Sequence, residues 1–286
     1  MFILVLIALL SINSQMYGAF IEQCLVRAAA KQGIRVEFGN PDVVGLSFRA
    51  SRLNMAFVRL LLSIQLGDLS MRPSLSSVLP PSAGVAITSS AYSGTINGKI
   101  SFDLIQPQRR IDLSVENLML GQHLQLQGLG LQGGITTLKL NAILSDTAID
   151  GRANFEIKGL NKPEVTLVPL PGSGTALLQS ITVPPITNIN FNVEIACQAG
   201  ECEASPVVLK SSLISAEGRG RFKLPGQQAI PNLDISMQVN LSASGQEQLG
   251  PFLPLLSRGK LEARTDSFKV TIQGAASAPA VEYERL

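Results

Sequence analysis

Residues Gly94–Leu104 read GTINGKISFDL, and this stretch decides the class of fold. Its apolar residues Ile96, Ile100, Phe102 and Leu104 fall on one side at period two, and the residues on the other side are polar. A strand with one apolar face and one water-facing side has this alternation. A glycine at position 98 lies on the apolar side, where a missing side chain permits a bulge or a tight bend.

The same alternation recurs almost to the end of the chain, which predicts a mainly β protein. We expect a large curved or twisted antiparallel sheet, formed as a half-pipe, a β-groove or a flattened sandwich. The alternation does not distinguish a covered core from an open groove, because both need one apolar face. The residues expected on that face, as core or as groove lining, are Ile96, Ile100, Phe102, Leu113, Val115, Phe155, Phe191, Val193, Val239 and Val270.

The composition argues against a nucleic-acid partner. Charged residues are 15% of the 286 residues, and the net charge is only +2. A nucleic-acid-binding domain usually carries a basic patch or stripe. Aromatic residues are 5%, and tryptophan is absent, so aromatic platforms for stacking bases are not expected either.

The first twelve residues, MFILVLIALLSI, are apolar, and no charge appears before Glu22. A membrane-spanning helix needs about 20 mostly apolar residues, and residues Met1–Ile21 just meet that length. A cleaved signal peptide would carry a basic segment before the apolar block, and none is present. The stretch therefore favours an uncleaved membrane anchor, with a cleaved signal peptide as the alternative. Either way, we expect most of the chain to be exported.

Residues 18–33 predict an amphipathic helix that continues from this segment. Helical spacing relates the apolar residues Phe20, Ile21, Cys24, Leu25 and Ala28, and Gly33 is a natural end. We expect the apolar stripe to cap one end of the β domain, with Cys24 as a small buried apolar residue. The predicted organisation is an anchor and helix at 1–32 and an exported β domain at 33–286. The proline-rich connection at 163–185 is a candidate boundary between halves 33–162 and 186–286, and we expect one helical turn within it.

Three shorter stretches carry their own predictions. Residues 73–82 hold three prolines and four serines, which predicts a loop. The alternating leucines at 124–131 predict strands, with Gly128 shifting the frame. Residues 245–259, GQEQLGPFLPLLSRG, predict a short helix or helical loop that crosses one end of the sheet.

Cys197 and Cys202 bracket a predicted hairpin turn. A C-x4-C pair alone falls short of a structural zinc site, which needs four ligands, and His123 is the single histidine. In an exported protein, the spacing favours a disulfide across the turn. The closed loop is short, so the expected stabilisation is about 2 kcal/mol.

Enzymatic function is not expected. Serine or cysteine nucleophiles need a positioned base, and His123 lies in a strand-like run that predicts a water-facing side chain. The spelling GxGxxG occurs at Gly128–Gly133, but a phosphate loop must open a helix, and β-branched residues follow here. No cofactor is expected.

The order of features resembles a known family. An apolar N-terminus and a helix ending AKQGIRVEF at 30–38 precede GxIxGxI at 94–100, LGPFLPLL at 249–256 and a terminal Gly274…Pro279. This order is similar to the type II secretion system protein N family (GspN), which is itself similar to AsmA-like proteins with periplasmic β-grooves. The resemblance covers most of the chain, and the family offers no catalytic residues to carry over.

The resemblance implies a structural or assembly component of the secretion machinery. It would be anchored in the bacterial inner membrane by one N-terminal segment, with its bulk in the periplasm and with other secretion components as partners. The alternative is an AsmA-like module that binds or transfers lipid, with phospholipid or lipid A-type acyl chains in an apolar groove.

Overall fold

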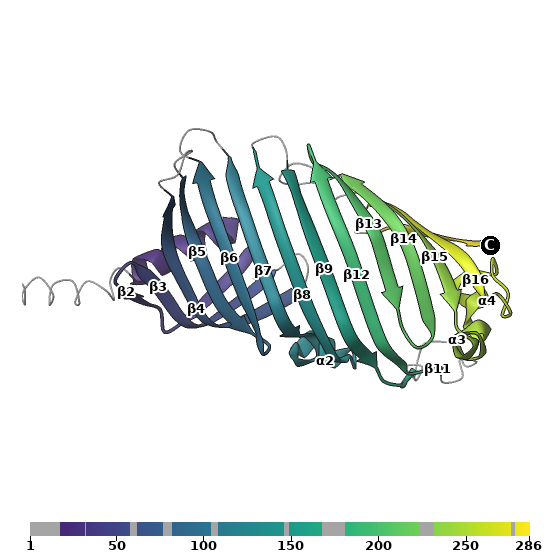
Figure 1. The fold of residues 1–286 in the computed structure, drawn as a ribbon. Coiled ribbons are helices and arrows are strands. Elements are labelled where there is room, and N and C mark those ends of the chain that lie inside the picture. Colours follow the sequence, from purple (N-terminus) through teal and green to yellow (C-terminus); the bar gives the residue numbers. More distant parts are fainter. Residues whose placement is uncertain are drawn as a thin grey trace, which may run out of the picture. The chain divides into compact units, whose positions relative to one another are not determined.

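The computed structural model describes residues 18–31, 33–57, 62–76, 82–103, 108–145, 149–167, 181–223, 232–275 and 278–286 (Figure 1). The anchor predicted for Met1–Ile21 falls largely on residues 1–17, which lie outside these ranges. Within them, the longest apolar helical stretch falls short of what a membrane crossing requires.

Antiparallel strands dominate the structure, which confirms a mainly β fold built on one large open antiparallel sheet. The strand order is β1-β3-β4-β5-β6-β7-β8-β9-β12-β13-β14-β15-β16-β17, with β2 beside β3 and with β10–β11 as a separate hairpin. The strands are β1 (Ile34–Gly39), β2 (Asp42–Val44), β3 (Ser47–Phe57), β4 (Leu62–Ser76), β5 (Ser82–Ala91), β6 (Gly94–Asp103), β7 (Arg109–Met119), β8 (Gln132–Leu144), β9 (Ile149–Lys162), β10 (Val165–Leu167), β11 (Ile181–Val183), β12 (Ile186–Gln198), β13 (Glu201–Lys210), β14 (Ile214–Lys223), β15 (Asn232–Leu241), β16 (Ser267–Ala275) and β17 (Ala280–Arg285).

The chain groups into two compact units. The first contains Met1–Leu118 and Ile143–Asp146, and the second contains Met119–Ala142 and Thr147–Leu286. The helical turn predicted within 163–185 falls on residues outside the described ranges.

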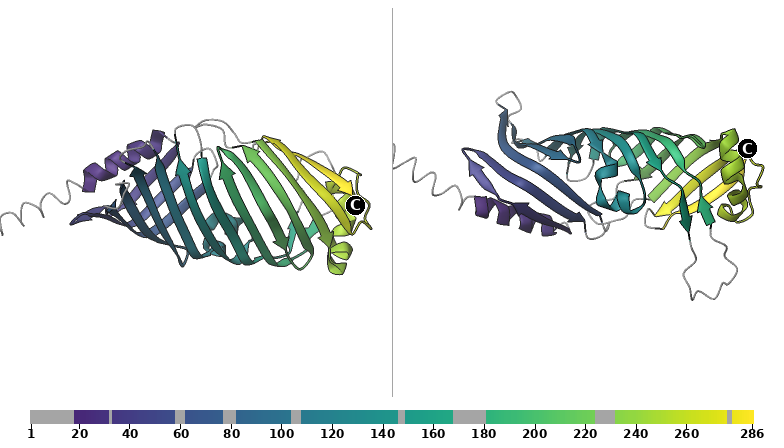
Figure 2. Two further views of the ribbon diagram at one scale, coloured as in Figure 1. Left: turned by 45° about the horizontal axis from the view of Figure 1, so that its top comes forward. Right: turned by 90° about the horizontal axis from the view of Figure 1, so that it is seen from below.

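The core of the first unit lies on the apolar side of its strands and under the N-terminal helix, residues 18–31. Ile21 and Leu25 pack against that core, which confirms the predicted capping role for this part of the apolar stripe. Phe20 and Ala28 of the same stripe are exposed, contrary to the prediction. Figure 2 shows this purple helix lying along the purple and blue strands. Cys24 is exposed, so its predicted burial is wrong. The buried residues of this core are Phe48, Ala50, Leu53, Leu66, Leu69 and Ala91.

Two local predictions in the first unit need correction. The predicted loop at 73–82 is strand as far as Ser76, because β4 continues beside β5. Pro73 is tolerated there since the ladder between β3 and β4 ends at Met71, which leaves Pro73 on an edge. Gly98 pairs with Ile87 and Leu113 in unbroken register, so the bulge permitted there does not form.

The second unit carries the short helices. The strand predicted at 124–131 is wrong, because α2 (Leu124–Gly128) begins this stretch, directly after η1 (Leu120–Gln122) and His123. His123 joins these two helices and is buried, contrary to the water-facing position predicted for it. The helical prediction for 245–259 is confirmed by α3 (Ala243–Leu249), η2 (Gly250–Phe252) and α4 (Leu253–Leu256).

Candidate functional site

The apolar face of the second unit is the candidate site, and the strand register builds it as four parallel rows of side chains. Residues paired directly across antiparallel strands point to the same face. Row 1 is Ile157, Phe191, Leu209, Ala216, Val239 and Phe268; row 2 is Phe155, Val193, Val207, Gly218, Met237, Val270 and Tyr283; row 3 is Ala153, Ile195, Ala204, Gly220, Ile235, Ile272 and Val281; and row 4 is Gly151, Cys197, Cys202, Phe222, Leu233 and Gly274.

A bulge in β13 keeps these rows continuous. Ala204 and Val207 are three positions apart, yet both face the apolar side, because the register shifts between them. The extra residue falls at Ser205–Pro206, and a bulge suits proline since one backbone N–H is not needed for the ladder. Strict alternation would turn Val207 toward water.

The helical connection between β15 and β16 covers rows 1 and 2 at one end of the strands. Leu253 and Leu261 are buried against Val239, Phe268 and Val270. Figure 2 shows the yellow-green helices at this end of the yellow-green strands. The Ser242 side chain accepts a hydrogen bond from the Gly245 N–H at 3.0 Å, which caps α3 and fixes where the connection turns.

Rows 3 and 4 are covered less than row 1. Phe268 in row 1 is 5% exposed, whereas Val281 in row 3 is 46% exposed. The isoleucines of row 3 and Phe222 of row 4 are half-buried. Ala204 of row 3 and Cys202 of row 4 are buried. A second cluster centres on Val193 and Val207, and the described hydrophobic side chains packed against it all come from strands of the same sheet. Within the described residues, Ile195 and Phe222 therefore pack sideways on neighbouring strands, whereas Ile272 packs against the cluster that contains Leu253 and Leu261.

The opposite face of the same strands is polar and charge-balanced. Arg221 pairs with Glu203 at 3.9 Å, and Lys223 pairs with Glu201 at 3.4 Å. A cavity of about 1160 Å³ is lined mostly by residues of this side, together with Gly151, Cys197, Cys202 and Phe222 of row 4. Its charged lining residues are three acids and three bases, namely Asp150, Glu201 and Glu203 with Arg152, Arg221 and Lys223. Such a balance suits a solvated face better than an anion site.

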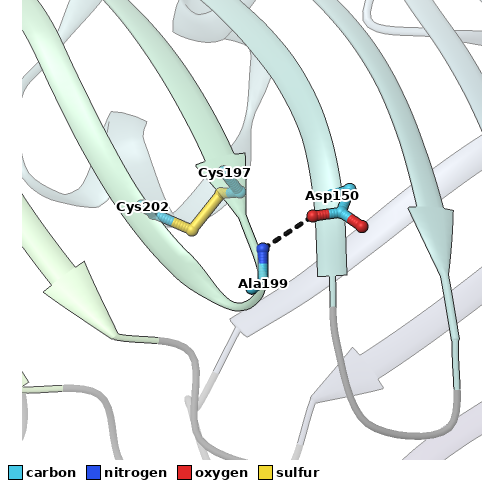
Figure 3. Close-up of a disulfide and its surroundings, with 4 residues drawn as sticks. All are labelled: Asp150, Cys197, Ala199 and Cys202. Carbon is cyan, nitrogen blue, oxygen red and sulfur yellow. Dashed lines mark hydrogen bonds between the residues drawn. A yellow bond between two sulfur atoms is a disulfide. The ribbon is translucent and has the colours of Figure 1, made fainter.

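Cys197 and Cys202 are bonded to each other across the β12–β13 turn (Figure 3). The two residues are direct register partners with Cα atoms 4.0 Å apart. The Asp150 carboxylate accepts a hydrogen bond from the Ala199 N–H at 2.6 Å, which ties the turn to β9. The disulfide and this hydrogen bond together fix the register of β9, β12 and β13 beside row 4.

The structure divides the ten predicted face residues between the two units. Phe155, Val193 and Val270 share row 2, and Phe191 and Val239 share row 1. The other five lie on one face of β6 and β7 in the first unit. There, Phe102 is 43% exposed and stands directly across from Arg109. Ile96 pairs with Val115, whereas Ile100 and Leu113 face other partners.

The ten face residues predicted from the sequence do not include two half-buried members of rows 3 and 4. Leu233 and Ile235 in rows 4 and 3 lie on β15 with the same parity as Val239, which was listed. The alternation that identified Val239 would have found them as well. Which members of one parity lie under the helices depends on the path of the β15–β16 connection, and alternation carries no information on that path.

Comparisons with protein-family models, with curated proteins and with solved structures found no match to this chain.

Proposed function

We propose that this protein binds lipid and that rows 3 and 4 of its apolar face hold acyl chains. Of the forms expected from the sequence, this function requires the half-pipe or β-groove and not the flattened sandwich. The observation that carries the proposal is the half-buried state of Ile195 in row 3 and Phe222 in row 4, whose described packing partners all belong to the sheet itself. Large apolar patches on a protein surface mark binding sites.

The chemistry of the rows favours alkyl chains over a peptide. Row 3 offers alanine, glycine, valine and isoleucine, and the strand backbone is already paired within the sheet. A peptide lying on such a surface would bury polar backbone groups without partners, which is costly. An alkyl chain brings no such groups and gains about 0.8 kcal/mol for each CH₂ buried.

Site-specific photo-crosslinking of the full-length chain in its native membrane fraction tests this proposal. A photoreactive phenylalanine derivative at Ile235 points into row 3, whereas the same group at Ser236 points to the polar face. We expect acyl-lipid adducts, detected by mass spectrometry, at Ile235 and not at Ser236. Equal adducts at both positions, or none at either, would overturn the proposal.

The second candidate is a structural component of the type II secretion machinery, held at the inner membrane with its bulk in the periplasm. Besides the family resemblance, it has one structural observation in its favour. The sheet path ends at β1 and β17, so each is an edge that a partner strand could extend. However, β17 carries Glu282, Glu284 and Arg285, and charges on an edge discourage strand addition.

Crosslinking at the edges tests this second candidate. The same photoreactive group at Glu282 on β17, which faces away from row 3, should capture components of the secretion machinery, and at Ser236 it should not. If neither those components nor acyl lipids are captured, the proposed resemblance to the GspN family should be withdrawn.

A further inference from the structure

The connection between β15 and β16 carries a short exposed tip, residues 255–260, which read LLSRGK. Leu255 and Leu256 are 68% and 60% exposed. A single exposed leucine is ordinary on a protein surface. Two adjacent leucines on one short helix (α4 in Figure 1) form a local apolar projection.

The tip is held rigidly, so its leucines are not exposed by a loose loop. The buried Ser257 hydroxyl accepts a hydrogen bond from the Leu261 N–H at 2.8 Å. The Gly259 N–H donates to the Pro254 carbonyl at 2.7 Å, and Gly259 has a φ of +83°, which favours glycine. Leu261 is 1% exposed and anchors the tip in the core.

The charges beside the leucines are positive. Arg258 and Lys260 are exposed, and neither forms an ion pair with any residue in the described ranges. The nearest acid in sequence, Glu262, pairs with Arg285 at 3.7 Å. Adjacent apolar and basic side chains match the interface of an anionic bilayer, where leucine enters the acyl boundary and the cations meet phosphate.

From these observations we infer that residues 255–260 dock on the surface of an anionic phospholipid bilayer. This inference goes beyond the proposed function, because it concerns contact with a membrane surface and not the occupancy of rows 3 and 4. The tip could dock even if the face held no acyl chain. It is also separate from the predicted N-terminal anchor, which would bring every variant of the chain to the membrane alike.

The absence of tryptophan from the chain permits a local readout. Leu256→Trp places one indole at the tip of the full-length chain, which is then reconstituted into vesicles containing brominated phospholipid. We expect its emission to shift to the blue and to be quenched when the vesicles contain phosphatidylglycerol. Leu129→Trp is the matched control, since Leu129 is 66% exposed after α2, and we expect no quenching there.

Charge variants test the choice of an anionic surface. Each cation near such a surface contributes about 1 kcal/mol, so Arg258→Gln with Lys260→Gln should lower the equilibrium constant for tip insertion about 30-fold. Lys139→Gln with Arg152→Gln removes the same charge from exposed sites away from the tip and should leave insertion unchanged. Leu255→Trp repeats the measurement if Leu256→Trp disturbs the fold by circular dichroism.

Three results would overturn the inference. The first is an unquenched indole at both tip positions. The second is equal quenching in vesicles of phosphatidylcholine alone. The third is a blue shift that depends on protein concentration and not on brominated lipid, which would identify a second copy of this chain as the partner.

Discussion

Leu261 shows how much a single residue holds the second unit together. It lies beneath the tip and packs with Val239, Val270 and Phe268, so removing its side chain opens a cavity under the helical connection. We expect Leu261→Ala to lower the free energy of unfolding by about 2–5 kcal/mol. Leu255→Ala, at an exposed position on the same connection, should change it by less than about 0.5 kcal/mol. Urea unfolding followed by circular dichroism measures both values, and similar losses would contradict the assigned burial.

The disulfide between Cys197 and Cys202 stabilises the protein mainly by restricting the unfolded chain. Their disulfide closes a short loop, and replacing both by serine should lower the free energy of unfolding by about 2 kcal/mol. A reducing agent should destabilise the unmodified chain by the same amount and leave the double variant unaffected. Cys24→Ser is the control, since this exposed cysteine is free and should not matter. A double variant as stable as the parent would show that the other contacts of the turn suffice.

At the scale of elements, Gly218 sets how closely β14 approaches β15. A Cβ at this position would lie 2.2 Å from the Ser236 carbonyl oxygen, closer than any real contact allows. Gly218→Ala should therefore destabilise the protein, because one of the two strands has to move. Gly128→Ala on α2 meets nothing within 4 Å and should stabilise by about 0.5–1 kcal/mol, because alanine is the better helix former. Melting temperatures of the two variants should move in opposite directions, and a shared direction would contradict this account.

The elements also show how far sequence reasoning reaches. Long alternation was reliable: β12, β14 and β15 each keep one parity facing the apolar side over ten or more residues. Short alternation failed at residues 124–131, where leucine and glutamine are both good helix formers and period two over a few residues is ambiguous. Composition failed at Pro73, because a proline-rich stretch continues a strand when it lies on an edge.

The sequence predicted which side chains share the apolar face, but not which of them the helical connection covers. Alternation selects which side chains share that face, and Phe155, Val193 and Val270 do share a row. It cannot show that the β15–β16 connection folds over row 1 and leaves the isoleucines of row 3 and Phe222 of row 4 half-buried, because that depends on tertiary packing around Leu253 and Leu261. The tip at 255–260 was missed for the same reason. Leucine is usually a core residue, so the sequence alone did not indicate that Leu255 and Leu256 are exposed.

At the scale of the whole molecule, an apolar face with little cover should bind an occupant whenever one is present. The full-length chain stripped of lipid should therefore bind a hydrophobic dye such as bis-ANS, and added long-chain phosphatidylglycerol should displace the dye. The melting temperature should rise with the same additions, because a ligand that binds the folded state alone stabilises it in proportion to RT ln(1 + [L]/Kd).

Two controls assign that effect to acyl chains in rows 3 and 4. Glycerophosphoglycerol carries the headgroup without acyl chains, so it should neither displace the dye nor raise the melting temperature. Ala153→Trp places a bulky side chain at a half-buried position of row 3 and should weaken lipid-dependent stabilisation, whereas Arg258→Gln with Lys260→Gln should leave it intact. If the headgroup alone stabilised the protein, the site would be electrostatic and the apolar face would be only an exposed part of the core. If the tip variant abolished stabilisation while Ala153→Trp did not, the melting temperature would be reporting contact with the bilayer surface, and binding in the rows would be excluded.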